Sequence, residues 1–186
     1  MQKSQRIRHV VLSVLMAGLM ATTGACTATR TQKTAGEQLD DTVVTARVKA
    51  ALVADPVTKA RQIDVEVFRG KVQLNGFVDS QAEKAAAARV ARGVQGVDGV
   101  QNNLEVRTGG AATAGEIVDD TTLTARVKAA LVENDQTKAH QINVAASNGV
   151  VQLSGFVDSA SAKSAASQVA RTVDGVKSVR NDLDVK

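Results

Sequence analysis

Aromatic residues, cysteine and proline are scarce in this 186-residue chain. It contains three phenylalanines, no tryptophan or tyrosine, one proline and one cysteine. A single cysteine cannot form an intramolecular disulfide, which excludes a disulfide-stabilised fold. With one cysteine and two histidines, the chain also has too few ligands for a Cys/His metal centre. No Ser-His-Asp, Cys-His or P-loop arrangement is present. We therefore expect a protein that is not an enzyme and that holds no metal or cofactor.

The N-terminal segment 1–25 has the pattern of a secretory signal peptide. Lys3, Arg6 and Arg8 precede a mostly apolar run from Val10 to Ala21, and small residues follow. This order of basic, apolar and small residues is typical of exported proteins. The apolar run is shorter than the roughly 20 residues that a membrane-spanning helix needs. We expect segment 1–25 to direct export and to be removed.

The only cysteine, Cys26, falls where such a signal peptide would be cleaved. With Gly24 and Ala25 before it, the site resembles the lipobox of bacterial lipoproteins, in which the cysteine becomes the first mature residue and is acylated. Thr23 departs from that pattern, which usually has an aliphatic residue there. By the same resemblance, Thr27 after the cysteine favours the outer membrane, facing the periplasm. The alternative is ordinary cleavage nearby, which discards the cysteine and gives a soluble periplasmic protein.

The basic character of the chain comes mostly from the signal peptide. The whole chain has 23 basic and 19 acidic residues and a pI near 9.4. Removing the three basic residues before position 26 leaves 20 basic and 19 acidic residues. A protein that binds nucleic acid should keep a basic face after processing. We therefore expect no nucleic-acid partner.

The rest of the chain is a tandem repeat without a gap, in which each position of the first copy matches the position numbered 79 higher. When Thr34–Val106 is aligned with Thr113–Val185, 44 of 73 positions are identical. Such a match indicates two copies of one fold. We place a tether at residues 26–38, the first domain at 39–107, a linker at 108–117 and the second domain at 118–186.

Each copy shows the order helix, strand, strand, helix, strand. The first helix has apolar residues at helical spacing, at Val44, Val48, Ala51 and Leu52 and again at the equivalent positions of the second copy. We expect Asp40 or Asp41 to cap it. Alternating residues then predict two strands around Arg69-Gly70, or Asn148-Gly149 in the second copy. Ser80 opens an Ala-rich helix, and a last strand follows. The predicted fold is α+β: two tandem αββαβ units, each a three-stranded mixed sheet packed with two helices.

This order and its motifs resemble the BON domain. The motifs are V-x-L-x-G-x-V in the second strand and G-V-x-x-V-x-N-x-L before and in the last strand. In the first copy they comprise Val72, Leu74, Gly76, Val78, Gly96, Val97, Val100, Asn102 and Leu104, and all recur in the second copy. Two such domains behind a signal peptide resemble dual-BON envelope proteins of Gram-negative bacteria, some soluble in the periplasm and some anchored to the outer membrane.

The resemblance implies a non-enzymatic envelope protein that binds phospholipid membranes, anionic ones in particular, and supports outer-membrane integrity or stress resistance. In the lipoprotein branch the lipid contact includes a tryptophan at the start of the second domain's first helix. The tryptophan position matches Thr122 here. We expect the contact to involve Thr122, Leu123, Arg126 and Lys128, with solvated helix charges as the alternative for the last two. A second hypothesis is a periplasmic adaptor or chaperone-like module that binds outer-membrane assembly or cell-wall proteins and no lipid.

Three further features have simpler explanations than a site. His140 matches Arg61 of the first copy and is expected on a surface loop. The spacing of Gly93, Gly96 and Gly99 superficially resembles a phosphate loop, but a strand follows rather than a helix, so we expect a turn. Phe68 lies on the polar side of its strand; we expect it to pack under the hairpin turn, with contact to the sister domain or a membrane as the alternative.

Overall fold

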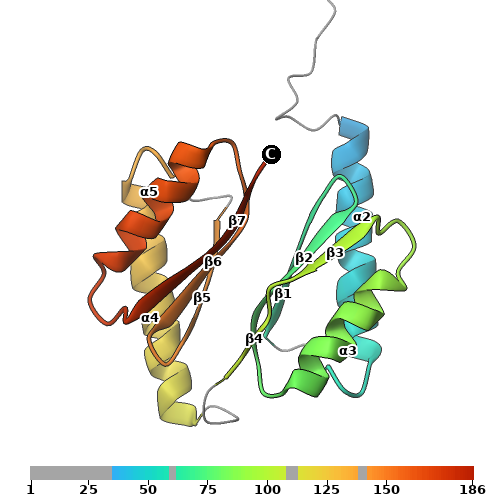
Figure 1. Cartoon of the computed structure of the whole chain (residues 1–186), viewed down its shortest axis with the longest axis horizontal. Coiled ribbons are helices and arrows are strands. Elements are labelled where there is room, and N and C mark those ends of the chain that lie inside the picture. Colours follow the sequence, from blue (N-terminus) through green and yellow to red (C-terminus); the bar gives the residue numbers. More distant parts are fainter. Residues whose placement is uncertain (1–34, 59–61, 108–112, 138–141) are drawn as a thin grey trace, which may run out of the picture.

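The computed structural model describes residues 35–58, 62–107, 113–137 and 142–186, and these form two domains with the same element order. Each domain has a mixed sheet with two helices on one face (Figure 1). The expected α+β class and the αββαβ order are confirmed. Residues 1–34, which include the predicted signal peptide and Cys26, lie outside the described part of the chain.

In the first domain the elements are α2 (Ala35–Ala54), β1 (Ile63–Phe68), β2 (Lys71–Val78), α3 (Gln81–Arg92), β3 (Gly99–Asn102) and β4 (Glu105–Val106). Strand β2 is central: it pairs antiparallel with β1 and parallel with β3 and β4. The predicted last strand is therefore divided in two. The division falls at Asn103, whose carbonyl accepts a hydrogen bond at 2.8 Å from Gln152 of the other domain.

The second domain repeats this arrangement with an undivided last strand. Its elements are α4 (Ala114–Glu133), β5 (Ile142–Ser147), β6 (Val150–Val157), α5 (Ala160–Arg171) and β7 (Ser178–Val185). Strand β6 is central, antiparallel to β5 and parallel to β7. In both domains the motif asparagine ties the last strand to the second helix. Asn102 Nδ2 donates to Lys84 O at 2.8 Å, and Asn181 Nδ2 donates to Lys163 O at 2.7 Å.

Each domain has its own small hydrophobic core between its helices and its sheet. The apolar spacing of the first helix correctly predicts the side that packs inward. Fully buried positions recur as equivalent pairs in the two copies: Val48, Leu52, Leu74, Ala87 and Leu104 in one core and Val127, Leu131, Leu153, Ala166 and Leu183 in the other.

The two aspartates at the start of the helical pattern do not cap the helices, so that prediction is wrong. Helix α2 begins at Ala35 and α4 at Ala114, ahead of the predicted domain limits. The N-cap of α4 is Thr113, whose Oγ1 accepts from the Glu116 backbone at 3.3 Å while the Glu116 carboxylate accepts from the Thr113 backbone at 2.8 Å. The sequence carries this capping-box signal as T-A-G-E.

Asp41 instead stabilises the β1–β2 turn. Its carboxylate accepts from the backbone N–H groups of Arg69 at 2.8 Å and Gly70 at 3.0 Å, and its side chain is buried. Both turn residues have positive φ, 50° and 75°, as a two-residue type I′ hairpin requires. Arginine is unfavourable at positive φ. The buried Asp41 carboxylate stabilises this turn by accepting from both backbone amides.

The sheets of the two domains pack face to face. In Figure 1 the helices lie on the two outer sides and the sheets meet in the middle, β2 of one domain against β5 and β6 of the other. The result is a four-layer arrangement of helices, sheet, sheet and helices. The sheet face that each domain leaves free of helices is therefore covered by its sister.

Two equivalent glutamines bridge this interface, and both are 1% exposed. Gln152 Oε1 accepts from Gly76 N at 2.7 Å, and Gln73 Oε1 accepts from Gly155 N at 3.1 Å. Their amide groups donate to Asp182 and Asp184 respectively, at 2.6 and 2.7 Å. Because the glutamine–glycine pair recurs with the roles of the two copies exchanged, the interface has approximate two-fold symmetry.

Phe68 also belongs to this interface. Its ring stacks on Phe156 of the second domain with centroids 5.1 Å apart, and its side chain is 9% exposed. The Arg69 guanidinium of its own hairpin turn lies over the ring, 5.4 Å from the centroid, so the expected packing against the turn and the alternative of contact with the sister domain both occur. At the rim, Asn143 donates to Glu66 at 2.6 Å.

Candidate lipid-contact surface

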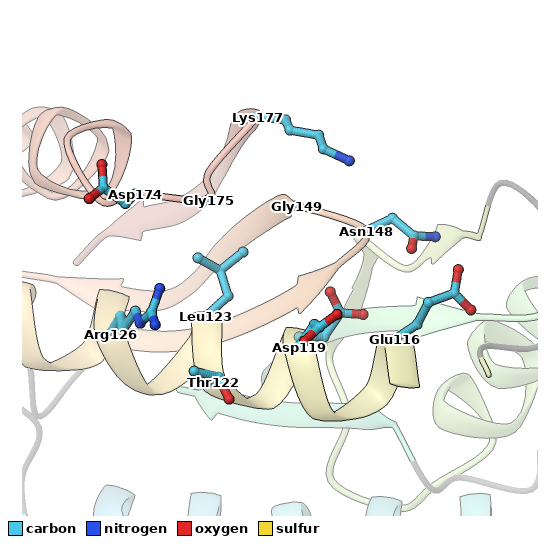
Figure 2. Close-up of a pocket in the computed structure, with 11 residues that line it drawn as sticks. Glu116, Asp119, Thr122, Leu123, Arg126, Asn148, Gly149, Asp174, Gly175 and Lys177 are labelled. Carbon is cyan, nitrogen blue, oxygen red and sulfur yellow. The ribbon is translucent and has the colours of Figure 1, made fainter. Parts of the chain in front are cut away.

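The four residues expected to contact lipid all lie on α4, but they do not share one face. Thr122 and Arg126 are one turn apart and exposed. Leu123 is 7% exposed and belongs to the core of the second domain. In Figure 2 Leu123 points from α4 toward the strands, whereas Thr122 points away from them. Leu123 is thus committed to the core and is not an apolar anchor for a bilayer.

Arg126 and Lys128 lie on different sides of α4. Residues two positions apart in an α-helix are separated by about 200° around the helix axis. Arg126 lines a hollow beside the β5–β6 turn. Desolvation raises the pKa of Asp64 in the first domain, and the charges of Lys49 and Lys128 lower it to a smaller extent, so Lys128 lies near the first domain. One flat surface cannot contact both side chains closely.

The hollow beside α4 is formed by the helix, the Asn148–Gly149 turn and the loop that precedes β7 (Figure 2). Its volume is about 330 Å³. Its lining contains four acidic residues and two basic ones: Glu116, Asp119, Asp120, Asp174, Arg126 and Lys177. The hydrogen bonds from Thr113 keep the pKa of Glu116 low, so this carboxyl carries its charge. The negative excess disfavours a phosphate group in this hollow.

The first domain has an equivalent hollow of about 480 Å³. It is lined by the matching part of α2, the Arg69–Gly70 turn and the loop before β3. At two lining positions the charge differs between the copies, because Arg69 is replaced by Asn148 and Asp98 by Lys177. Both hollows therefore follow from the fold, while their charges are particular to each domain.

The other features considered in the sequence analysis form no ligand or metal site among the described residues. Gly96 has φ of +93° and lies in the turn before β3, which confirms the turn interpretation of that glycine series. His140 and Cys26 lie outside the described residues. Within the described ranges, histidine, cysteine, aspartate and glutamate form no group of three or more that could hold a metal ion. No described helix has the length and apolar character of a membrane span.

Comparison with known proteins agrees with this architecture. The family model of the BON domain matches residues 40–108 and again 119–186. The chain belongs to the BON-domain family. Each match covers one αββαβ unit, so the family accounts for both domains.

Several curated BON-domain relatives align along most of this chain. Osmotically-inducible protein Y of Escherichia coli (strain K12) is 37% identical over 195 aligned positions, covering 97% of each chain. The 21 kDa hemolysin of Actinobacillus pleuropneumoniae is 36% identical and covers 79% of this chain and 75% of its own. Outer membrane lipoprotein DolP of Haemophilus influenzae is 33% identical with the same coverage.

The residues that sequence reasoning missed are those between the domains. Gln73 and Gln152 stand at polar positions of alternating strands, and that pattern alone assigns them no partner. One signal was available: Phe77 and Phe156 lie on the same side as these glutamines, and Phe77 is only 6% exposed. An aromatic on the polar side of both copies indicates that this side is covered.

Proposed function

We propose that this BON-domain protein acts in the bacterial envelope as a membrane-associated, non-enzymatic factor. An acyl chain at Cys26 anchors it to the outer membrane from the periplasmic side, and its two domains contact anionic phospholipid as one unit. In this way it supports the integrity of the outer membrane. The supporting relatives are an osmotically inducible protein and an outer membrane lipoprotein.

The observation that carries the proposal is a rigid two-domain body with exposed, uncompensated basic side chains. The buried glutamine bonds hold the domains together. Exposed arginines on the helices, such as Arg89 and Arg171, form no ion pair with another described residue. Basic residues near an anionic membrane surface contribute about 1 kcal/mol each. Without tryptophan or tyrosine at the interface, we expect the contact to be weak and sensitive to salt.

An acyl chain and weak electrostatic contact complement each other. One acyl chain gives only marginal membrane binding, and a second signal makes the attachment stable. The distance from Cys26 to the start of α2 at Ala35 is nine residues, which span at most about 32 Å when extended. The folded domains of an anchored chain therefore stay next to the bilayer.

The test separates the domains from the anchor. Fragment Thr27–Lys186 contains every described element and both cores, and it is mixed with vesicles of phosphatidylglycerol and phosphatidylcholine or of phosphatidylcholine alone. We expect flotation with the anionic vesicles only, and release by salt. An absence of binding to either vesicle would contradict direct lipid contact and favour the adaptor hypothesis, in which a protein partner is captured by crosslinking.

A second experiment tests the anchor in a Gram-negative host. We expect the full chain to incorporate labelled palmitate and to fractionate with the outer membrane. The Cys26→Ser variant should lose the label and appear in the soluble periplasmic fraction. If the wild-type chain takes up no label and is released with periplasmic proteins, ordinary cleavage is correct and the anchor is not.

A further inference from the structure

The second helix of each domain carries almost only positive charge. The basic side chains are Lys84, Arg89 and Arg92 on α3 and Lys163 and Arg171 on α5. The one acidic residue on either helix is Glu83, and its carboxylate accepts from the Asp79 backbone at 3.0 Å at the start of α3. None of the five basic side chains forms an ion pair with another described residue.

Helices α3 and α5 lie on the same broad face of the two-domain body. Helix α3 packs beside α2, and α5 packs beside α4. In Figure 1, which looks down the shortest axis, both α3 and α5 stand in front and the fainter α2 and α4 lie behind. The approximate two-fold symmetry of the sheet interface produces this placement, because it relates α3 to α5. We call this side the α3/α5 face.

The charge around the first helices is mixed. The hollow beside α2 is lined by three aspartates and two arginines, and the hollow beside α4 by four carboxylates and two basic residues. The chain has 20 basic and 19 acidic residues once segment 1–25 is removed, so an overall excess of charge does not account for attraction to an anionic surface. An anionic surface is therefore attracted to the basic helices α3 and α5 more than to the mixed charge around the two hollows.

The exposed side of α3 is also suited to close approach. Gln81, Ala85, Arg89 and Arg92 fall within about 80° of one another around the helix axis. Ala85 is small, so its side chain does not hold the two arginines away from a flat surface. In α5 the equivalent positions are Ala160, Ser164, Gln168 and Arg171, and the first two of these side chains are small.

Helix stability explains only part of this charge. Arg89, Arg92 and Arg171 lie in the last turns, where cations favour the helix dipole. Lys84 and Lys163 lie near the helix N-termini, where a cation is unfavourable for the same reason. The two lysines occupy equivalent positions in the two domains and fit an external partner better than an internal role.

Building on the proposed function, we infer that the α3/α5 face is the surface that contacts anionic phospholipid, and that the α4 surface is not the main contact. The partner is a bilayer with anionic headgroups, whose phosphates the lysines and arginines meet across a broad plane. Both domains contribute, α3 with three basic side chains and α5 with two, and the sheet interface is necessary because it places the two basic helices on one side.

Two variants with equal loss of charge test this inference. Both are made in fragment Thr27–Lys186. The first replaces four basic residues of the α3/α5 face, R89Q, R92Q, K163Q and R171Q. The matched control replaces four exposed basic residues of the first helices, R47Q, K49Q, R126Q and K128Q. Glutamine already occupies position 168, the equivalent of Arg89, so the exchange suits this helix. We expect the first variant to bind phosphatidylglycerol vesicles about tenfold to a hundredfold more weakly, and the control to change little.

Single tryptophans give an independent readout, because the chain has none of its own. Ala85→Trp places the reporter on the exposed side of α3, and Thr122→Trp places it on α4. We expect the emission of the α3 reporter to shift to the blue when anionic vesicles are added, and that of the α4 reporter to remain unchanged. Circular dichroism confirms that each variant is folded.

The outcomes separate the two proposals. If the wild-type fragment ignores anionic vesicles, the proposed lipid contact itself fails. If it binds and the α2/α4 control loses affinity while the α3/α5 variant does not, lipid contact stands and the assigned face is wrong. Equal losses in the two variants would show that binding follows total charge, which also overturns the assignment to one face.

Discussion

Gln152 Oε1 accepts a hydrogen bond from the backbone N–H of Gly76 across the domain interface, at 2.7 Å. The reciprocal bond joins Gln73 and Gly155 at 3.1 Å. In each strand the glycine has φ near +113° and the glutamine side chain comes from the opposite sheet. The repeated sequence thus supplies both halves of one contact, and the duplication explains the symmetry of the interface.

Loss of either glutamine should destabilise the protein through the interface. Gln152→Ala leaves the Gly76 N–H and the Asn103 carbonyl buried without a partner, which should lower the free energy of unfolding by about 2–3 kcal/mol. Gln101→Ala, at an exposed position of β3 in the first domain, should change it by less than about 0.5 kcal/mol. Urea unfolding followed by far-UV circular dichroism measures both, since the chain has no tryptophan or tyrosine.

The double variant adds a test of cooperation between the two bonds. Once one glutamine is removed and the sheets separate more easily, removal of the other should cost less than it does alone. We expect a coupling of about 0.5–3 kcal/mol between Gln73→Ala and Gln152→Ala. Additive effects would contradict this cooperation, and negligible effects of both changes would contradict the face-to-face arrangement.

The glycine of the V-x-L-x-G motif should tolerate no side chain. A Cβ at Gly76 would lie 2.2 Å from the Gln62 carbonyl oxygen, a backbone atom that cannot move aside easily. The positive φ adds strain of about 1–3 kcal/mol for any other residue. We expect Gly76→Ala to lower stability by at least about 2 kcal/mol. Gly99→Ala is the matched control, because nothing lies within 4 Å of its Cβ. Equal thermal midpoints for both variants would contradict this account.

Local sequence patterns predicted the helices and hairpins, whereas the contacts between the domains depend on tertiary structure. The buried side of the first helix follows from the spacing of Val48 and Leu52, because helix periodicity alone fixes which residues share a face. The hairpins follow from Asn148-Gly149 and its equivalent. The roles of Gln73 and Phe68 could not be predicted in the same way, since alternation shows only that their side chains point away from the core of their own domain. What covers them is the second domain, which is distant in the sequence.

The candidate lipid site shows the same limit. Family resemblance identified α4, but a linear stretch from Thr122 to Lys128 runs around a helix, so its members face the core, the hollow and the first domain in turn. The α3/α5 face depends on how two basic helices from different domains are placed together. That placement requires the sheet interface and is invisible in either copy alone.

Asp41 should be important for the first hairpin and not for the helix that contains it. Asp41→Ala removes the acceptor for two turn amides, and we expect a loss of about 1–3 kcal/mol in the free energy of unfolding. Asp40→Ala, next to it and exposed, should have little effect. Changing Arg69 to Asn in the Asp41→Ala background gives the Asn-Gly turn of the second copy and should recover part of the loss. No rescue, with equal effects at positions 40 and 41, would support a helix-capping role instead.

Asp64 should make the protein less stable as the pH rises through the acidic range. Partial burial raises its pKa above the ordinary 3.8, against the opposing effect of Lys49 and Lys128. Between 3.8 and the raised value the native state binds more protons than the unfolded state, so stability falls with increasing pH in that window. Asp64→Asn, which introduces the residue found at the equivalent position 143, should remove this fall and be more stable than wild type at neutral pH.

The pKa of Glu116 is shifted in the opposite direction to that of Asp64, so its effect on stability should depend on pH in the opposite way. Hydrogen bonds from Thr113 lower its pKa in the folded state, so its contribution is present above the ordinary 4.5 and is lost as the pH falls through the lowered value. Glu116→Gln should therefore be less stable than wild type at neutral pH and should approach it in acid. Urea midpoints measured from about pH 3 to pH 7 distinguish the two variants. If Asp64→Asn were less stable than wild type at neutral pH, the attraction of the two lysines would outweigh the cost of burial, and the charged carboxylate would hold the domains together rather than strain them.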